Sequence, residues 1–388
     1  MPTHRGADED DFFEQRTFSS AKKTAILVRF FKAWASVIGR TATRMLYIDL
    51  YCGPGSYERD ENGRKATPTD PVYSTPVLVV KAAANDAAFA RSVTCIFNDG
   101  NAEYVERLRE TIEALPERAK LKFAPQYYSG MVDEQVAEAF AAARLPPALL
   151  FVDPFGYVGL TRDLIRSVLK DWGTDCVFFW NHDRINRAFG TDKFDRYLVA
   201  LFGEQRVAAM RIALSAMNDP VEREDYILEN LFSALGEIGG TYCIAFRFRD
   251  GSGRTKQHLV FTSKHLRGYQ VMKGVLASQG SAQPDGVPTY EFVEPSGLGL
   301  LEGFLPPRDF PYSVARLANE LKAHYGKLSR RFDELVIEHS VRQPYVEKNY
   351  RQAILLLVDR GAVTLQRPDG STPKPRTCPP DTTITFKP

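Results

Sequence analysis

The stretch from Met45 to Gly55, MLYIDLYCGPG, decides the fold of this chain. An apolar run ends in Asp49 and passes directly into a Gly-Pro-Gly turn that contains Gly53 and Gly55. A buried parallel strand followed by a tight glycine turn is typical of sites where the backbone approaches a nucleotide-like cofactor. The alternative is ordinary turn chemistry, in which glycines only supply the required backbone conformation. The segments that follow favour the cofactor site.

Strand-like and helix-like segments alternate around this stretch. An amphipathic helix over residues 19–39 precedes it, with Ile26, Phe30 and Trp34 on one stripe. Parallel strands that alternate with helices need crossover connections, so the sequence predicts an α/β fold whose mostly parallel sheet is covered on both faces. The segments predicted after the first strand are 75–85, 93–98, 101–115, 121–128, 131–143, 149–153, 161–171 and 175–180.

The sheet is predicted to end in an antiparallel hairpin. Two strand patterns, 241–249 and 256–263, are joined by a linker that is too short for a crossover helix. The nicotinamide-binding Rossmann domain keeps its later strands parallel. Class I S-adenosylmethionine-dependent methyltransferases instead end their sheet with such a hairpin, so the predicted fold class is a Rossmann-like class I methyltransferase sheet.

The pattern of segments also predicts a second domain. Three helical patterns, near residues 313–325, 329–341 and 345–360, are followed by two short strand patterns. This order is typical of a winged helix. A Gly- and Pro-rich segment precedes these patterns and indicates a linker. The predicted organisation is a leader and helix over 1–44, a methyltransferase-like domain over 45–280 with a helical insertion at 183–238, a linker over 281–311 and a winged helix-like domain over 312–388.

The composition is that of an ordinary globular protein. The chain has 388 residues, 44% hydrophobic content and a net charge of +2, so no global charge attracts nucleic acid or membranes. From Leu305 onward, fourteen Lys/Arg face nine Asp/Glu, which makes the C-terminal part locally basic. Five scattered cysteines without a CxxC pair predict buried thiols and no metal site. No apolar run reaches the roughly 18 residues of a membrane span, so we expect a cytoplasmic protein without a membrane partner.

Asp49, Gly53, Gly55 and Asp99 are the predicted cofactor-binding residues. The nicotinamide fingerprint needs a third glycine where this chain has Glu58, and the Gly-Lys-Ser/Thr of a P-loop is absent after Gly55. S-adenosylmethionine carries no phosphate, and it needs glycines for close approach and acidic side chains at strand ends for its ammonium and hydroxyl groups. In the alternative interpretation, Asp49 caps the turn and Asp99 caps the following helix.

Other polar residues are expected on the same rim. Tyr128 and Ser129 end the third strand and are predicted neighbours of the adenine, and Asn98 is a reserve for Asp99. His182 follows the fifth strand, where it is either a general base or a hydrogen-bonded structural residue.

The candidate catalytic residues are Asp153, Pro154 and Phe155, in the segment LLFVDPFG. This segment resembles the Asp-Pro-Pro-Tyr motif of methyltransferases that act on exocyclic amino groups of bases. In that chemistry a carboxylate and a proline carbonyl accept the amino hydrogens, and an aromatic ring stacks on the flipped base. Gly156 departs from the motif, because the aromatic residue comes one position early. The alternative is that Asp153 orients the cofactor or caps the next helix.

The C-terminal domain carries a candidate nucleic-acid surface. The last helical pattern leaves Lys348, Arg351 and Gln352 on its outer face, and Arg330 and Arg331 lie upstream in a predicted helix over residues 329–341. Such side chains suit contacts with phosphates and base edges. Winged helices also dock proteins, so both partners stay open.

Five stretches together resemble the three-Cys-motif partner protein family, over about residues 20 to 280. The resemblance implies a methyltransferase-like fold and a radical-type three-Cys-motif protein as partner, with Asp49, Gly53, Gly55 and Asp153 as motif positions. The stretches are KKTAILVRFFKAW (22–34), YIDLYCGPGSY (47–57), STPVLVVKAA (74–83), FVDPFG (151–156) and TSKHLRGYQVMKGVL (262–276).

The main functional hypothesis is an S-adenosylmethionine-dependent methyltransferase that acts on nucleic acid, with a base amino group as the candidate target. One alternative is a non-catalytic partner protein that keeps the fold and docks the radical-type protein. Another is a methyltransferase for a small molecule.

Overall fold

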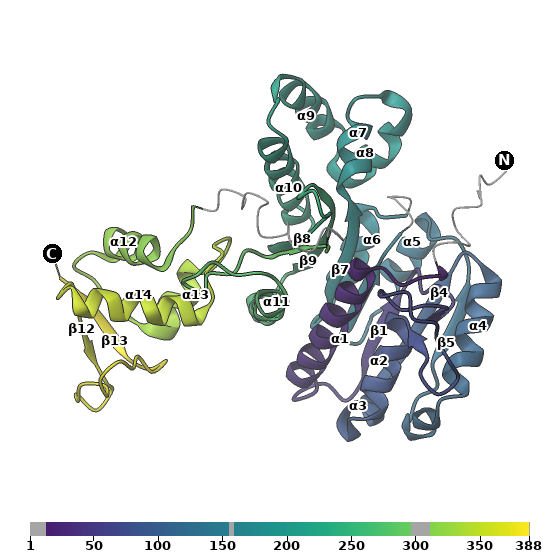
Figure 1. Ribbon diagram of the computed structural model, residues 1–388, viewed down its shortest axis with the longest axis horizontal. Helices are drawn as coiled ribbons and strands as arrows, with labels where there is room; N and C mark the ends of the chain where they lie inside the picture. The colour runs from purple at the N-terminus through teal and green to yellow at the C-terminus, as the bar shows by residue number, and fades with distance from the viewer. Residues whose placement is uncertain (1–12, 155–158, 296–310, 388) are drawn as a thin grey trace. The chain divides into compact units, whose positions relative to one another are not determined.

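The computed structural model describes residues 13–154, 159–295 and 311–387 (Figure 1). The chain divides into two compact units, Met1–Val275 with Phe292–Glu302 and Leu276–Glu291 with Gly303–Pro388. Each unit has a hydrophobic core of its own.

The first unit is built on an eight-stranded sheet in the order β10-β8-β9-β7-β6-β1-β4-β5. β1 pairs in parallel with β4 and β6, whereas β9 is antiparallel to both β7 and β8. The predicted α/β class and the antiparallel ending are therefore confirmed. The strands are β1 (Met45–Asp49), β4 (Val93–Asp99), β5 (Gln126–Ser129), β6 (Ala148–Val152), β7 (Asp175–Asn181), β8 (Tyr242–Arg249), β9 (Thr255–Ser263) and β10 (Glu291–Val293).

The short strands β2, β3 and β10 were not predicted. β10 extends the sheet from within residues 281–311, which the sequence indicates as a linker. The small hairpin of β2 (Ser56–Tyr57) and β3 (Val72–Tyr73) ties together the two ends of the loop after the glycine turn. Strands of two or three residues are too short to show the alternation on which strand prediction depends.

One face of the sheet is covered by α1 and α2, which pack on each other. Aromatic side chains fill this layer: Phe31 packs against Tyr47 on β1, and Phe30 packs against Phe261 on β9. Thr17 caps α1 by accepting a hydrogen bond from the Ser20 N–H. The helices of the first unit up to the insertion are α1 (Phe18–Ile38), α2 (Thr75–Ala84), α3 (Ala87–Ser92), α4 (Ala102–Glu113), α5 (Glu134–Ala142) and α6 (Arg162–Leu169).

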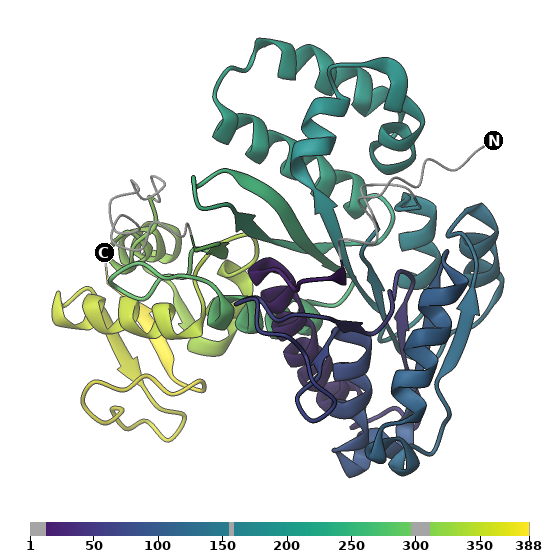
Figure 2. The same ribbon diagram turned by 45° about the vertical axis from the view of Figure 1, so that its right-hand side comes forward.

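The other face carries α5, α6 and the insertion, within one continuous core. Residues 183–238 are predicted to be mainly helical. The structure has four α-helices there, and only the first residue of α7 precedes the range: α7 (His182–Ala188), α8 (Asp195–Phe202), α9 (Glu204–Ala216) and α10 (Pro220–Gly236). Figures 1 and 2 show these helices grouped beyond the carboxyl end of β7. Trp180 near the end of β7 packs against Phe202 of α8, so the insertion is anchored on the sheet. The hairpin of β8 and β9 follows, and then α11 (Leu266–Gln279).

The second unit combines three helices with an antiparallel sheet in the order β11-β13-β12. Its core includes Leu317, Leu321, Tyr350 and Ile354. The elements are α12 (Val314–Tyr325), β11 (Ser329–Arg331), α13 (Phe332–His339), α14 (Glu347–Asp359), β12 (Val363–Gln366) and β13 (Thr383–Phe386).

Candidate functional site

The parallel strands β1, β4, β5, β6 and β7 end at one edge of the sheet, called the carboxyl edge below, and the glycine turn follows β1 there. Gly53 has φ +62° and Gly55 has φ +90°, which is left-handed backbone that favours glycine. A Cβ atom on Gly53 would lie 2.8 Å from the Phe13 ring, and one on Gly55 would lie 2.8 Å from Leu108 Cδ1. The turn therefore needs both glycines, for conformation and for space.

Asp99, at the end of β4, braces this turn. Its Oδ2 accepts a hydrogen bond from the Gly53 N–H at 3.0 Å, and its Oδ1 accepts one from the Asn101 N–H at 2.9 Å. The residue that caps α4 is Asn101, whose side chain accepts a hydrogen bond from the Glu103 N–H. The capping role considered for Asp99 thus belongs to Asn101, and Asp99 is tied to the turn.

Asp49 is buried beneath the same turn, with 1% of its surface exposed. It accepts hydrogen bonds from the Tyr51 N–H at 3.2 Å and from the Tyr47 hydroxyl at 3.3 Å. Burial and the nearby charges of Asp153 and Asp99 raise the pKa of Asp49 to about 8, against the lowering effect of its hydrogen bonds. A strand-end carboxylate in this state can give up a proton near neutral pH when a positive charge approaches.

Asp153 follows β6 and is held by a lysine that the sequence analysis missed. Lys23 Nζ lies 3.3 Å from Asp153 Oδ2 and 3.7 Å from the centre of the Phe179 ring. The side chain of Lys23 is 12% exposed and that of Asp153 is 32% exposed. Pro154 is buried beside them, whereas Phe155 lies outside the described residues. One feature of the sequence could have identified Lys23. It lies three residues before Ile26, in line with the apolar stripe of α1.

Two predicted residues lie at the end of β5, next to β4. Tyr128 is 54% exposed and Ser129 is also exposed, and Ser129 pairs with Asp99 in the sheet register. Asn98 donates hydrogen bonds to the carbonyl groups of Leu50 and Gly130, so it links neighbouring strand ends. An exposed ring at a strand end is suited to stack on an aromatic ligand.

An N-terminal segment lies across the glycine turn. The Phe13 ring contacts the rings of Tyr57 and Tyr104, at centroid distances of 5.8 Å and 5.2 Å. The backbone carbonyl of Phe13 accepts a hydrogen bond from the Glu58 N–H, and the carbonyl of Glu14 accepts one from the Arg59 N–H. Sequence reasoning identified this segment only as a polar leader, because contacts made by so short a segment leave no periodic pattern.

His182 belongs to a buried polar cluster. Its ring packs edge-on to His258, whose Nε2 lies 2.9 Å from Glu224 Oε1. Burial and the charge of His258 lower the pKa of His182 to about 4, so the ring is neutral at physiological pH. Asn181 caps α7 by accepting a hydrogen bond from the Arg184 N–H. Both residues join the insertion to the sheet. The role of His182 is one of packing, because its Nδ1 is buried without a hydrogen-bond partner in the described residues.

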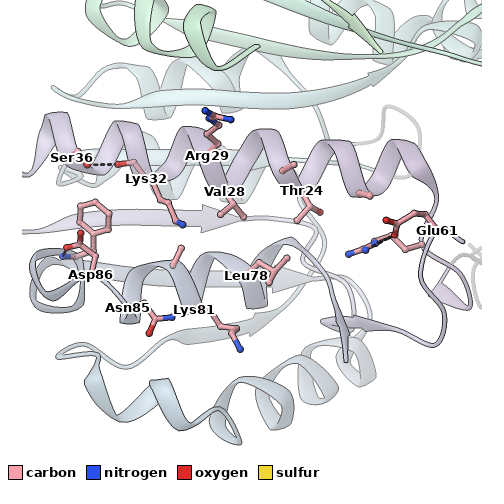
Figure 3. Close-up of a pocket in the computed structure, with 15 residues that line it drawn as sticks. Thr24, Val28, Arg29, Lys32, Ser36, Glu61, Leu78, Lys81, Asn85 and Asp86 are labelled. Atoms are coloured by element: carbon pink, nitrogen blue, oxygen red, sulfur yellow. Dashed lines mark hydrogen bonds and ion pairs between the residues drawn. The ribbon is translucent and has the colours of Figure 1, made fainter. Parts of the chain in front are cut away.

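A large groove lies elsewhere, between α1 and α2 (Figure 3). Its volume is about 900 Å³, and cationic side chains of Arg29, Lys32 and Lys81 line it. None of the strand-end carboxylates Asp49, Asp99 and Asp153 is among the lining residues. The groove is therefore separate from the carboxyl edge.

The predicted nucleic-acid residues lie on two elements of the second unit. Arg330 and Arg331 are on strand β11, where the sequence predicted a helix, because these residues pair with β13 far along the chain. Arg331 is bound to Asp333, and Arg351 on α14 donates to Glu347 and to the Cys378 carbonyl. Lys348 and Gln352 on α14 are exposed. Arg331 is exposed as well, but its guanidinium is engaged by Asp333.

The described residues contain neither a cluster of metal-ligating side chains nor a membrane-spanning helix. Across residues 13–154, 159–295 and 311–387, no group of three His, Cys, Asp or Glu side chains is placed to hold a metal ion. No helix in these ranges combines the length and apolar character of a membrane span. The five cysteines are all buried, as the sequence predicts.

Comparisons with known proteins give structural similarity alone. Neither the family models nor the curated proteins give a match. Similar solved structures include a Legionella pneumophila protein of the family model DUF519, with 10% identity, TM-score 0.37, and coverage of 64% of this chain and 85% of that one. The methyltransferase domain of bacterial CtHen1-C has 13% identity, TM-score 0.31, and coverage of 62% and 100%. Precorrin-6y C5,15-methyltransferase from Geobacter metallireducens has 9% identity, TM-score 0.29, and coverage of 66% and 96%. Similarity at this level does not support an argument about function. A functional proposal therefore has to rest on the residues of the site.

Proposed function

We propose that this protein is an S-adenosylmethionine-dependent methyltransferase whose cofactor crevice lies at the carboxyl edge of β1, β4 and β6. The observation that carries the proposal is the brace between the Gly53 N–H and Asp99, in a turn with two left-handed glycines above the buried Asp49. Backbone that approaches closely and acids at strand ends are what a nucleoside without phosphates requires at this edge of an open α/β sheet.

The residues present fit this cofactor, which supplies an electrophilic methyl group when bound. Asp99 has one oxygen on the Gly53 N–H and is only partly buried, so it can accept hydrogen bonds from ribose hydroxyls. Asp49 provides a negative charge for the ammonium group. Gly53 and Gly55 let the backbone approach, and Tyr128 offers an exposed ring to the adenine.

Asp153 would act on the methyl acceptor. The ion pair with Lys23 fixes the position of its carboxylate, which can accept a hydrogen bond from an amino group and orient the lone pair of the nitrogen. The carbonyl group of Pro154 would accept the second amino hydrogen. In this scheme the protein works mainly by positioning, and Asp153 is the group whose loss should matter most.

The acceptor that we favour is a nucleic acid. The second unit has the order helix, strand, helix, helix, strand, strand, from which we infer a winged helix with α14 as its recognition helix. The exposed Lys348 and Gln352 would then contact phosphates and base edges, whereas Arg330, Arg331 and Arg351 would contribute less because carboxylates already engage them. Docking of a radical-type three-Cys-motif protein is the alternative use of this unit.

One observation favours a non-catalytic partner protein as the second candidate. The Phe13 ring lies over Gly53, so the chain itself covers part of the glycine turn. A protein that had lost the cofactor could keep such a cover permanently, and it would then use the fold only for docking.

The test is transfer of labelled methyl groups from S-adenosylmethionine into total RNA, total DNA, cell protein and a small-molecule fraction. We expect label in a nucleic-acid pool, lost in Asp153→Ala. Label in the small-molecule or protein fraction would redirect the proposal to that acceptor. If no pool is labelled and S-adenosylhomocysteine does not bind, the methyltransferase proposal fails in favour of the partner protein.

A further inference from the structure

A cavity opens at the carboxyl edge, next to the Asp153 site. It is distinct from the groove between α1 and α2. Its volume is about 210 Å³, and it lies between the first turns of α1, the end of β8 and the start of β9. Asn181, the last residue of β7, pairs with Gln257 on β9, which places this wall of the cavity at the level where β7 ends. The cavity is too small for a whole drug-sized molecule, but it can hold one substituent of a larger ligand.

Lys23 connects this cavity with the proposed acceptor site. Its side chain lines the cavity, and its Nζ lies 3.3 Å from Asp153 Oδ2. The ring beneath the ammonium is Phe179, which in turn contacts Phe248 of the cavity wall. A group bound in the cavity would therefore lie one side chain away from the carboxylate that is proposed to orient the methyl acceptor.

The wall of the cavity is mainly positive. Among the described residues that line it, Lys23, Arg249 and Lys256 are cations and Glu294 is a carboxylate. Lys256 is 40% exposed, and its Nζ lies 3.3 Å from Asp250 Oδ2 and 3.7 Å from Asp183 Oδ2, so two carboxylates hold its position. Cations that converge on a small concave space attract an oxyanion more strongly than the same charges on an open surface.

Two further groups indicate what the cavity can recognise. The Ser19 N–H in the first turn of α1 donates a hydrogen bond to Glu294 Oε1 at 3.1 Å, so this corner already binds a carboxylate oxygen. Gln257 lines the cavity, and its Oε1 is buried without a hydrogen-bond partner in the described part of the chain. A buried acceptor of this kind calls for a donor from a ligand or from water.

We propose that this cavity binds a phosphate group of the methyl acceptor, through Lys23, Arg249 and Lys256, while Gln257 accepts a hydrogen bond from a hydroxyl or amino group next to that phosphate. The inference rests on the proposed methyltransferase function and specifies its substrate as a phosphorylated nucleoside unit. Glu294 sits beside the bound phosphate and opposes it, so removal of its charge strengthens binding. The phosphate belongs either to a free nucleotide or to the backbone of a polynucleotide.

The test uses the full-length protein and two probes, adenosine monophosphate and a single-stranded decanucleotide, titrated at constant ionic strength. Lys256→Ala is expected to weaken phosphate binding about tenfold, because it removes a charge-assisted hydrogen bond. Glu294→Gln is expected to strengthen it about threefold. Lys122→Ala, which removes an exposed lysine just before β5, is the matched control and leaves both affinities unchanged. Circular dichroism checks that the variants fold.

The two arms separate the sources of the phosphate. A response of both probes or of the decanucleotide alone supports a polynucleotide backbone, and a response of the monophosphate alone supports a free nucleotide. The proposal is overturned if Lys256→Ala binds as tightly as Lys122→Ala, or if neither probe binds at millimolar concentration. Titration with S-adenosylhomocysteine is run in parallel. If S-adenosylhomocysteine does not bind, the proposed function is contradicted. If it binds but the phosphate probes do not, only the phosphate inference is contradicted.

Discussion

The glycine turn and the Asp153 site lie at the same edge of one sheet, but they are built in different ways. At the turn, Asp99 and Asp49 accept hydrogen bonds from backbone N–H groups, and Asp49 is almost fully buried. At the other site a carboxylate that is 32% exposed is held by the side chain of Lys23. The first site depends on backbone conformation and the second on side-chain charge. Changes at the turn should therefore disturb folding and cofactor affinity, whereas changes at Asp153 should disturb turnover.

The largest effect is expected at Asp153. Asp153→Ala removes the proposed hydrogen-bond acceptor and should lower kcat by about 10³, within the range of a lost acid–base or positioning group. Asp153→Asn keeps an acceptor oxygen and should retain much more of the activity. The measurement is kcat and KM for methyl transfer, with the affinity for S-adenosylhomocysteine determined in parallel.

Lys23→Gln is the companion variant, because it removes the ion pair but keeps a polar side chain that is only one atom shorter. It should fall between wild type and Asp153→Ala in turnover, while the cofactor affinity stays within about twofold. Equal losses of cofactor affinity and turnover in these variants would contradict the distinction between the glycine turn and the Asp153 site, because they would show that the two form a single unit.

The second effect concerns the conformation of the turn. Gly55→Ala places a side chain at φ +90° and 2.8 Å from Leu108 Cδ1, so the free energy of unfolding should fall by about 2–3 kcal/mol. Urea denaturation measures the loss. Gly236→Ala is the matched control, because a Cβ there meets no atom within 4 Å, and it should leave the protein as stable or slightly more stable. A neutral Gly55→Ala would show that the turn is not constrained.

These sites differ in how far the sequence could predict them. Asp49, Asp99 and the two glycines come at strand ends, and a strand followed by a glycine turn is a local pattern. The position of Asp153 after β6 follows from the same pattern. The role of Lys23 depends on how α1 crosses the sheet. In the sequence, the one indication of this role is that a lysine lies on the apolar stripe of the helix. Phe13 reaches Gly53 through tertiary contacts for which no local pattern exists.

The second unit shows the same limit. The helical patterns near residues 313–325 and 345–360 are strongly periodic, and both helices are present. The sequence predicts a helix over residues 329–341, which includes Arg330 and Arg331. Pairing of β11 with β13, which lies about 50 residues later, overrides that local preference.

A third prediction concerns the dependence of cofactor affinity on pH. Asp49, with its pKa raised to about 8, is mostly protonated at pH 6 and ionised above pH 8. The ammonium group of S-adenosylhomocysteine is attracted by the ionised form, so binding should release a proton and affinity should rise with pH, by at most about tenfold per unit, up to pH 8. Calorimetry in buffers of different ionisation enthalpy measures the proton release. Asp49→Asn should remove it, and an unchanged pH profile in that variant would assign the titration to another group.

The smallest effect is expected at Phe13. If the segment is a cover that closes over bound cofactor, Phe13→Ala should leave folding intact and weaken S-adenosylhomocysteine binding about threefold, mainly through faster dissociation. Stopped-flow displacement measures the rate. Tighter binding in Phe13→Ala would show that the ring obstructs the crevice and would favour the partner-protein alternative.

The most direct test of the cofactor crevice is a calorimetric titration of S-adenosylhomocysteine into wild type and Asp99→Asn. We predict one site per chain with a dissociation constant in the micromolar range for the wild type. Asp99→Asn should bind at least about tenfold more weakly, because the ribose loses a charged acceptor. Absence of binding to the wild type, or equal binding to both proteins, would contradict a cofactor site at this edge of the sheet.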